Sequence, residues 1–457
     1  MSDRSSTVRL VVDGEAVDPL VLRRAVADVT RAAAGAGAGP GLGVLAPTTN
    51  GIAFVAAAEA CRRTGAALIL RSPYARTAGL PAVCEVGDGP AGPWVTPLPI
   101  GADGRFPADT AVACFTSGST GDPRLALLGA EGQDYQYRAT AERMGTDDTD
   151  RLCLPLPLAH AYGFSVLGMA RLTGAQLWVE TRNDALAILD RLAPDGITTL
   201  DGVPGLYAAL LARLERFPEK RRAFAALRFR GCGGEVLPAW IEEGFARWGA
   251  VLHNGYGLTE AGPNVALNAP GHFHPGTVGL PLPGTEVTIE ASRGELLVRG
   301  PGVMSGYFGA DPPRPRSDGW LATGDQAEWR GPALRVMGRL EHRVTIQGET
   351  IIPADLEALM SDRCSVGRVV VDAFADRRGA TRLGAVVVTP DGGDLAPWRA
   401  AVRDLLPPAL RPRVVVPVGT LPYLANGKLD RGAVRALLTE HAAKTSRSMA
   451  RGGHHGD

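Results

Sequence analysis

The sequence predicts an α/β protein, with a large N-terminal α/β domain of several subdomains, one of them a small β subdomain, and a small α+β C-terminal domain. Three observations support this. Short valine-, isoleucine- and leucine-rich runs alternate with helical segments early in the chain, period-two alternation begins near residue 275, and mixed strand and helix patterns follow residue 342. This order is typical of α/β layers followed by a separate α+β domain.

The first region carries the strand–helix alternation. Strand-like runs include "LGVLAP", "AALIL", "AVACF", "AQLWVE" and "GITTLDGV", while "DALAILDRLA" and "VPGLYAALLARLERF" have helical spacing. Strands that alternate with helices in this way form mostly parallel sheets.

The later regions have different textures. The segment "TEVTIEASRGELLVRGPGVMSGY" alternates with period two and contains glycine turns, which predicts antiparallel strands. Beyond it, "ADLEALM" and "APWRAAVRDLL" are helical in pattern, and "VGRVVVDAFA" and "RLGAVVVTP" are strand-like. A domain of about one hundred residues fits this segment. The end, "TSRSMARGGHHGD", is small, polar and aperiodic, which predicts disorder.

Composition limits the classes of partner. The chain has 457 residues, is 45% hydrophobic and 21% charged, and has a formal net charge of zero, so it lacks the basic signature of a nucleic-acid-binding protein. Neither a signal peptide nor an uninterrupted apolar stretch of about 18 residues is visible. The six cysteines show no CxxC pairing, so no zinc site is suggested. We expect a cytoplasmic protein without nucleic-acid or membrane partners.

The stretch "FTSGSTGDPR", residues 115–124, directly follows the apolar run "AVACF". Serine, threonine and glycine offer hydroxyl and backbone N–H donors without side-chain bulk, as a phosphate group requires. The glycine spacing is not that of the GxxxxGK[ST] loop. The loop therefore predicts a phosphate site of another kind, with a surface turn as the alternative interpretation.

Five further motifs follow in order: "NGYGLTEAG" (254–262), "GELLVRGPGVMSGYF" (294–308), "DGWLATGD" (318–325), "GRLEHRVTIQGETIIPADLE" (338–357) and "LPYLANGKLDR" (421–431). Together with the first loop they resemble the adenylate-forming superfamily of acyl-CoA ligases, peptide-synthetase adenylation domains and luciferases. The resemblance implies ATP-dependent activation of a carboxylic acid to an acyl-AMP. It also implies a core over 1–338, a hinge at 339–341, a mobile C-terminal lid over 342–440 and a tail over 441–457.

The resemblance assigns the nucleotide-binding residues. The loop residues that would hold the ATP phosphates are Thr116, Ser117, Gly118, Ser119, Thr120 and Gly121, with Arg124 where the family usually has lysine. The residues implied around the base and the α-phosphate are Gly233, Gly234, Glu235, Asn254, Gly255, Tyr256, Gly257 and Thr259. Glu260 would hold Mg²⁺, which lowers the repulsion between two anions, and Asp325 and Arg339 would contact the ribose.

Lysine is rare in this chain. Of 48 lysines and arginines, three are lysines: Lys220, Lys428 and Lys444. Lys428 falls on the family's adenylation lysine, whose compact ammonium can lie between the substrate carboxylate and the α-phosphate. A second lysine of the family is replaced by Thr345, and Glu341 occupies the hinge position.

The segment "PLPLAHAYGF" (155–164) resembles the wall of the acid pocket, with His160 near the reacting carboxyl. The implied pocket residues are His160, Ala161, Tyr162, Gly231, Cys232, Gly255 and Leu258. Amino-acid-activating relatives have aspartate after the histidine, where this chain has Ala161. A buried, unpaired α-ammonium is costly, so we expect an aryl or aliphatic acid without an α-amino group.

Three functions remain open. The first is transfer of the acyl group to coenzyme A or an acyl carrier protein, with Gly348 near the thiol path. The second is activation of nitrite as its AMP adduct to diazotise an aminoaryl acid, which would use the same residues. The third is a non-catalytic relative. Arg124 and Thr345 favour this interpretation, whereas Lys428 and Glu260 argue against it.

Overall fold

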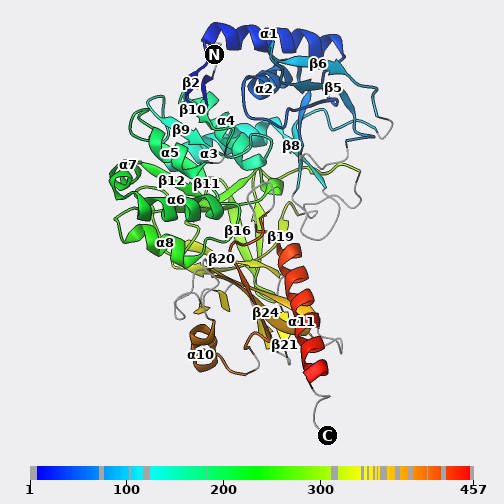
Figure 1. The fold of residues 1–457 in the computed structure, drawn as a ribbon. Coiled ribbons are helices and arrows are strands. Elements are labelled where there is room, and N and C mark those ends of the chain that lie inside the picture. Colours follow the sequence, from blue (N-terminus) through cyan, green and yellow to red (C-terminus); the bar gives the residue numbers. More distant parts are fainter. Residues whose placement is uncertain are drawn as a thin grey trace. The chain divides into compact units, whose positions relative to one another are not determined.

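In the computed structural model the chain divides into two units (Figure 1). The first comprises Met1–Leu237, Phe245–Thr323 and Glu328–Arg335, and the second Pro238–Gly244, Gly324–Ala327 and Val336–Asp457. The structure describes residues 8–71, 77–101, 104–116, 124–182, 184–309, 318–340, 344–346, 349–351, 353, 356–357, 359–360, 368–375, 381–389, 395–408, 410–423 and 429–452.

A seven-stranded sheet of the first unit has the order β18-β8-β7-β4-β3-β5-β6. Its strands are β3 (Gly43–Leu45), β4 (Ala67–Leu70), β5 (Ala82–Gly87), β6 (Trp94–Pro97), β7 (Thr110–Phe115), β8 (Leu125–Gly129) and β18 (Gly306–Tyr307). The four central strands β7, β4, β3 and β5 are parallel, and β8, β18 and β6 are antiparallel to their neighbours. The central strands are almost wholly buried, which explains their continuous apolar runs.

A nine-stranded sheet of the same unit has the order β15-β14-β13-β12-β11-β9-β10-β1-β2. Its strands are β1 (Arg9–Val12), β2 (Glu15–Ala16), β9 (Arg151–Leu154), β10 (Gln176–Val179), β11 (Thr199–Gly202), β12 (Phe229–Cys232), β13 (His253–Gly257), β14 (Asn264–Leu267) and β15 (Leu280–Pro281). The neighbouring strands of this sheet pair in parallel over the series β1, β10, β9, β11, β12 and β13. The prediction of an α/β region with mostly parallel sheets is therefore confirmed.

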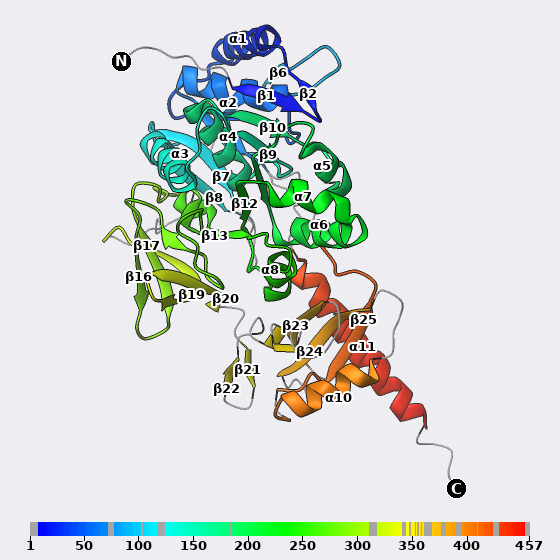
Figure 2. The same cartoon turned by 90° about the vertical axis from the view of Figure 1, so that its left-hand side faces the viewer.

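Helices connect these strands: α1 (Pro19–Gly35), α2 (Ile52–Thr64), α3 (Ala130–Met144), α4 (Ala161–Thr173), α5 (Ala185–Arg191), α6 (Pro204–Arg216) and α7 (Arg221–Ala225), with short 3₁₀ turns η1 (Pro218–Lys220) and η2 (Thr259–Ala261). Helices α2, α3 and α4 end at Gly65, Gly145 and Gly174, each with positive φ. Helices α3 and α4 pack on each other; α3 also contacts β7 and β8, and α4 contacts β9 and β10 (Figure 2). The two helices thus lie between the two sheets.

A four-stranded sheet follows, with the order β16-β17-β19-β20. Its strands are β16 (Glu286–Glu290), β17 (Glu295–Arg299), β19 (Leu321–Arg330) and β20 (Ala333–Arg339), of which β16 and β17 form an antiparallel hairpin. The period-two alternation that begins near residue 275 therefore correctly predicted a separate β region. The middle of β19 and the end of β20 belong to the second unit.

The second unit contains a three-stranded sheet with a helix on each face. The strands are β23 (Val369–Ala375), β24 (Thr381–Val388) and β25 (Val414–Val418), with a two-stranded pair β21 (Val344–Ile346) and β22 (Glu349–Ile351) and helices α8 (Ala239–Ala246, mostly in this unit), α10 (Ala396–Leu405) and α11 (Arg431–Gly452). Alternate residues of β24 enter different cores: Val387 packs with Trp398 of α10, and Val386 with Leu438 of α11. This alternation matches the period-two pattern of an α+β domain.

The tail differs from its prediction over residues 441–452. Helix α11 continues to Gly452, where the sequence predicts disorder for 441–457. Helix-favouring residues continue through "LLTEHAAK", and Lys444 forms an ion pair at 2.7 Å with Glu440, one helical turn earlier. The polar composition of the tail did not indicate this helix. Among the described residues no helix is long and apolar enough to cross a lipid bilayer.

Candidate active site

Several predicted site segments follow the carboxyl ends of parallel strands in the first unit. The phosphate loop follows β7 and the histidine segment (155–164) follows β9. The glycine segment, defined as residues 231–234, forms the end of β12 and the turn after it, and the "GYGLTEAG" motif follows the start of β13. Ligands of parallel α/β sheets bind at this edge. The fold therefore places these distant motifs at the carboxyl ends of strands of its two large sheets.

The phosphate loop closes on itself at its base. The Thr116 N–H donates to the Arg124 carbonyl at 2.8 Å, and the Arg124 N–H donates to Thr116 Oγ1 at 3.3 Å. The antiparallel pairing of β7 with β8 holds these two residues together. The other predicted phosphate residues, Ser117, Gly118, Ser119, Thr120 and Gly121, lie outside the described residues.

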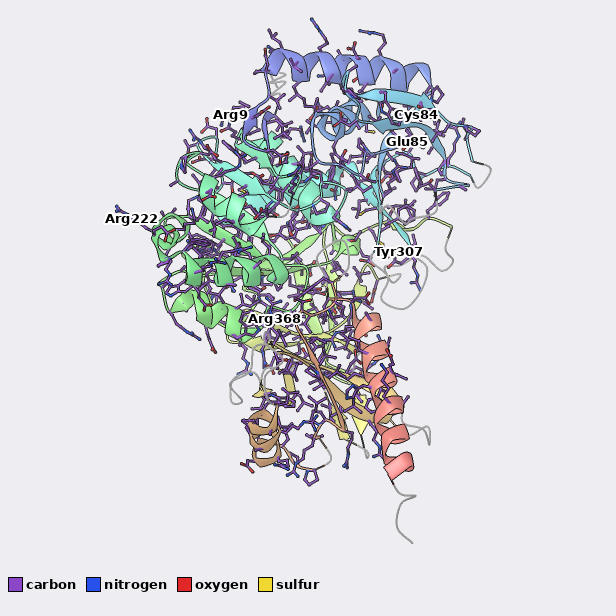
Figure 3. The ribbon with its side chains drawn as sticks, in the orientation of Figure 1. Arg9, Cys84, Glu85, Arg222, Tyr307 and Arg368 are labelled. Atoms are coloured by element: carbon purple, nitrogen blue, oxygen red, sulfur yellow. The ribbon has the colours of Figure 1, made fainter. Side chains whose placement is uncertain are left out.

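Tyr307 joins two charged site residues. Its hydroxyl lies 2.7 Å from Glu260 Oε1, and the Arg124 guanidinium carbon lies 5.4 Å from its ring centroid. Strand β18, which carries Tyr307, pairs with β8 beside the base of the phosphate loop, so the tyrosine lies at the edge of the seven-stranded sheet (Figure 3). The cation expected at the phosphates and the carboxylate expected at the metal thus share one aromatic neighbour.

Thr259 and Glu260 lie on the 3₁₀ turn η2 near the end of β7. Burial raises the pKa of the Cys114 thiol to about 12; Glu260 adds to the shift, while a hydrogen bond with Thr259 opposes it. Two buried glutamine amides fix the turn, because Gln136 Nε2 donates to the Ala261 carbonyl at 2.9 Å and Gln133 Nε2 donates to the Gly262 carbonyl at 3.1 Å. Sequence reasoning missed both glutamines, which lie 125 and 129 positions away.

The donors at this turn suit Mg²⁺. A single carboxylate, Glu260, stands beside hydroxyl groups, and the described residues contain no cluster of three or more metal-binding side chains. Mg²⁺ is usually held by one or two carboxylates together with substrate phosphates and waters, rather than by a full protein cage. Glu260 therefore fits a magnesium ion that arrives with a nucleotide.

The glycine segment leaves room for neighbouring groups. A β-carbon at Gly231 would lie 2.5 Å from Asp201 Oδ1 and 3.2 Å from the Tyr162 hydroxyl, and one at Gly233 would lie 3.5 Å from Tyr162 Cε1. Gly255 and Gly257 are similarly crowded by Leu267 Cδ1 and the Pro263 carbonyl oxygen. Side chains at these positions would displace the wall of the predicted pocket. Cys232, between Gly231 and Gly233, is buried.

Asp201 is a pocket neighbour that the sequence interpretation missed. Asp201 lies near the carboxyl end of β11, opposite Gly231 of β12. Its Oδ1 accepts a hydrogen bond from the Tyr162 hydroxyl at 2.9 Å. Burial raises the pKa of Asp201 to about 7, although the Tyr162 hydrogen bond and Arg228 act in the opposite direction. An aspartate inside the apolar run "GITTLDGV" was the available signal.

The histidine segment enters helix α4. His160 is the N-terminal cap residue and Ala161 begins the helix; both adjoin Tyr162 in the first turn. Asn50 fixes the approach to this helix, because its amide donates to the Leu156 carbonyl at 2.9 Å and its Oδ1 accepts from the Leu158 N–H at 2.8 Å. Asn50 belongs to no motif that would identify it from the sequence.

The strand β13 carries four of the predicted residues, and three more lie in the turn after it and after β12. Partly buried positions of β13 and the turn after it are Asn254, Gly255, Tyr256, Gly257 and Leu258. Gly234 follows β12 with φ of 88° and is exposed, and Glu235 is partly buried.

The two predicted ribose residues meet in the second unit. Arg339 Nε lies 3.1 Å from Asp325 Oδ1, and the Asp325 side chain is 8% exposed. The predicted contact positions are therefore paired through an ion pair. Lys428, Glu341 and Gly348 lie outside the described residues, while Thr345 pairs with Thr350 between β21 and β22.

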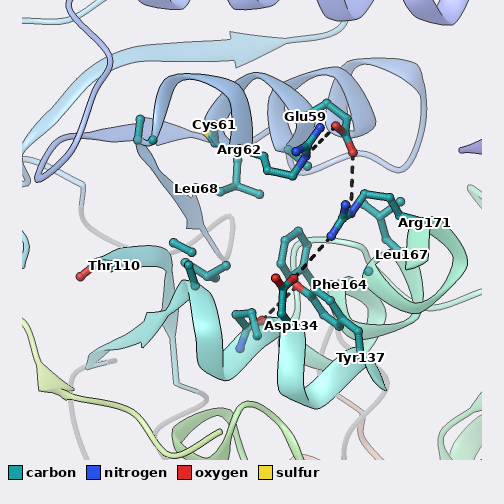
Figure 4. A pocket seen from close by; sticks show the side chains of 18 of the residues that line it. Glu59, Cys61, Arg62, Leu68, Thr110, Asp134, Tyr137, Phe164, Leu167 and Arg171 are labelled. Atoms are coloured by element: carbon teal, nitrogen blue, oxygen red, sulfur yellow. Dashed lines mark hydrogen bonds and ion pairs between the residues drawn. The ribbon is translucent and has the colours of Figure 1, made fainter. Parts of the chain in front are cut away.

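A separate cavity of about 380 Å³ lies between α2, α3 and α4 (Figure 4). Its wall is mostly apolar and includes Leu68, Phe164 and Leu167. At its mouth Arg171 lies 3.9 Å from Glu59 and 3.6 Å from Asp134. Opposite charges are thus matched there, which gives the cavity no preference for a nucleotide phosphate.

Comparisons with known proteins find relatives of similar sequence and similar fold. The family model described as "AMP-binding enzyme" matches residues 97–308. The chain is 29% identical to a feruloyl-CoA synthase of an Amycolatopsis species, covering 74% of this chain and 71% of the relative. It is 29% identical to an indoleacetate–CoA ligase of Aromatoleum aromaticum, covering 73% and 68%. The crystal structure of the anthranilate CoA ligase AuaEII with anthranoyl-AMP shares 18% identity, with a TM-score of 0.82 and 96% of each chain covered.

Proposed function

Because this chain belongs to the adenylate-forming superfamily, we propose that it is an AMP-forming acid–thiol ligase. A carboxylic acid attacks the α-phosphorus of ATP, the bond to the leaving pyrophosphate breaks, and an acyl-AMP forms. A thiol of coenzyme A or of a carrier protein then attacks the acyl carbon and displaces AMP. The observation that carries this proposal is the approach of Arg124 and Glu260 to Tyr307 at the base of the phosphate loop.

Each described residue has a role that suits its surroundings. The Thr116 and Arg124 backbones shape the phosphate loop, and the Arg124 side chain supplies positive charge at its base. Glu260 would hold Mg²⁺, which when bound neutralises phosphate charge. Thr259 supplies a hydroxyl at the same turn. Asp325 forms an ion pair with Arg339. Its carboxyl group can accept hydrogen bonds from ribose hydroxyls.

Lys428 and the lid remain proposals from the sequence. We propose that Lys428 stabilises the charge that develops at the α-phosphate, and that the segment after a hinge near Glu341 turns between the two half-reactions. The proposed boundaries are those of the sequence analysis, namely a core over 1–338 and a lid over 342–440.

We propose an acid of the aryl, cinnamoyl or aliphatic class without an α-amino group. Ala161 follows His160, so the position at which amino-acid-activating relatives carry aspartate offers no carboxylate. The two relatives are named for feruloyl and indoleacetate, which are acids with an aromatic ring, and this supports the aryl class.

The test is acid-dependent release of pyrophosphate from ATP and Mg²⁺ across benzoic, cinnamic and fatty acids, with and without coenzyme A. We expect AMP as the nucleotide product and a thioester only when the thiol is present. ADP as the product would contradict the proposal. Pyrophosphate release that needs nitrite together with an aminoaryl acid would instead establish the diazotising reaction.

A further inference from the structure

Strand β11 presents a buried carboxyl group that the proposed reaction does not use. Asp201 is 3% exposed, and among the described residues its Oδ2 has no hydrogen-bond partner. A buried polar atom without a partner reduces the stability of the folded state. An aspartate at this position therefore calls for a reason beyond packing.

Tyr162 links this carboxyl to the acid pocket. The tyrosine is partly exposed, follows His160 by two residues, and donates its hydroxyl hydrogen bond to Asp201 Oδ1 at 2.9 Å. Gly231 leaves the space that the pair occupies, because a β-carbon there would lie 2.5 Å from Asp201 Oδ1 and 3.2 Å from the Tyr162 hydroxyl. Asp201 is thus the buried member of the pair, and Tyr162 is the partly exposed one.

The direction of this hydrogen bond determines what Tyr162 can offer. An ionised carboxylate can only accept hydrogen bonds, so the Tyr162 hydroxyl donates its single proton to Asp201. The phenolic oxygen then retains lone pairs and has no proton left to donate. It is satisfied by an O–H or N–H group on the substrate, and an acid without such a group leaves it unpaired.

We propose that the Asp201–Tyr162 pair makes the acid pocket an acceptor of hydrogen bonds, and that the enzyme selects carboxylic acids carrying an additional hydroxyl or amino group. The inference rests on the proposed function, because it assigns a substrate class to the same pocket. Asp201 acts through Tyr162 and is a positioning residue, whereas Tyr162 touches the substrate.

Protonation of Asp201 gives the inference a second readout. The pKa of Asp201 is about 7, so the ionised carboxylate that accepts the Tyr162 hydrogen bond is the main form above pH 7 and is lost as the pH falls below 7. The ionisable groups that interact with Asp201 are Tyr162 on α4, Tyr207 on α6, Cys153 on β9 and Arg228 before β12, and Cys232 on β12 faces both tyrosines. The Cys153 thiol and the two phenols remain neutral in this range because burial raises the pKa of each, and Arg228 is paired with Asp150 at 2.6 Å.

The experiment compares matched acids: benzoate with 3- and 4-hydroxybenzoate and 3-aminobenzoate, and cinnamate with 4-hydroxycinnamate. For each acid, kcat/KM for pyrophosphate release and the equilibrium Kd are measured on the wild type, Tyr162→Phe and Asp201→Asn. We expect the wild type to favour at least one donor-bearing acid over its unsubstituted partner by about 10- to 100-fold, the range of one hydrogen bond to a charge-coupled group. The preference should fall below about threefold in Tyr162→Phe and lose its pH dependence in Asp201→Asn.

Tyr207→Phe is the matched control. The Tyr207 hydroxyl is also buried beside β11, but it donates to the Leu200 carbonyl at 2.9 Å and not to Asp201. This variant should be less stable yet keep the preference. A merely structural Asp201–Tyr162 pair would instead leave the acid preference unchanged in Tyr162→Phe.

The outcomes separate this inference from the proposed function. If no acid yields AMP and pyrophosphate, the proposed function fails, and the Kd values still decide the inference. Equal affinity for the members of every pair, a preference retained by Tyr162→Phe, or failure to bind any of the acids would each overturn it.

Discussion

The Tyr307 hydroxyl lies 2.7 Å from Glu260 Oε1, and the same tyrosine ring lies 5.4 Å from the Arg124 guanidinium carbon. One aromatic residue thus connects the metal-binding carboxylate of the proposed site with the cation at the base of the phosphate loop. A planar guanidinium stacks on an aromatic ring better than an ammonium does. This relationship accounts for arginine at position 124, where the superfamily usually has lysine.

Tyr307→Phe is expected to weaken the use of Mg²⁺. The ring and its stacking with Arg124 remain, but the hydrogen bond that orients the Glu260 carboxylate is lost. We expect the half-saturating Mg²⁺ concentration for pyrophosphate release to rise about 3- to 10-fold, as loss of about 1 kcal/mol would produce. Calorimetry of ATP binding with and without Mg²⁺ gives a readout independent of turnover, and binding without the metal should not change.

Tyr135→Phe is the control for that experiment. Its hydroxyl also makes a hydrogen bond, to the Pro283 carbonyl at 2.7 Å, but not with Glu260. The control should leave the Mg²⁺ dependence unchanged. An equal effect of both substitutions would show that Tyr307 has no special relation to the metal.

Lys428→Ala is expected to separate the two half-reactions. If the ammonium stabilises charge developing during adenylation, formation of acyl-AMP should fall by on the order of 10² to 10³, while ATP binding changes much less. Transfer from chemically supplied acyl-AMP to the thiol should persist. Lys220→Ala and Lys444→Ala are matched controls, because these lysines pair with Asp190 and Glu440. Acyl-AMP formation at the normal rate in folded Lys428→Ala would disprove the assigned role.

The sequence predicted the architecture wherever hydrophobic period and burial agree. The runs around Val112 and Leu68 are apolar throughout because their strands are buried on both faces, and they read correctly as parallel strands. The tail was misjudged for the opposite reason: its helix has little apolar periodicity, so composition alone suggested disorder through residue 452.

The motifs also predicted which segments meet, but not the contacts between them. Glu260 and Arg124 were identified singly, whereas their common neighbour Tyr307 belongs to a strand that pairs with β8 from 178 or more residues away in sequence. Asp201 was missed because a lone aspartate in an apolar run carries no motif. Its meaning depends on Tyr162 and Gly231, which only the sheet register brings beside it.

His253 is expected to reduce stability in acid. It is 4% exposed, and burial, with help from Arg230 and Arg228, lowers its pKa from 6.5 to about 4. The unfolded chain therefore binds the proton more readily between these two values, so this histidine's contribution is complete above pH 6.5 and is lost as the pH falls toward 4. The loss amounts to roughly 3 kcal/mol for a shift of this size.

Urea unfolding of the wild type and His253→Gln at several pH values isolates this contribution. Asp201 acts in the opposite sense, since its raised pKa removes stability as the pH rises toward 7, so the wild-type curve alone would mix the two effects. The difference between wild type and variant should decrease as the pH falls from 6.5 to 4. A difference that stays constant over this range would rule out a buried neutral histidine.

Thr110→Val is expected to stabilise the protein by about 1 kcal/mol, because it removes a buried hydroxyl that has no partner while keeping the shape of the side chain. Thr110 is 3% exposed, and its Oγ1 has no hydrogen-bond partner among the described residues, although the residue borders the cavity between α2, α3 and α4. Thr140→Val is the matched control: Thr140 is 6% exposed, but its hydroxyl accepts from Asn264 Nδ2 at 3.1 Å, so the same change should destabilise by about 1 to 2 kcal/mol. Opposite signs in the free energy of unfolding are the expected result. If Thr110→Val also destabilises, its hydroxyl must be satisfied from within the cavity by water or a bound molecule, and the cavity would have to be treated as a polar site.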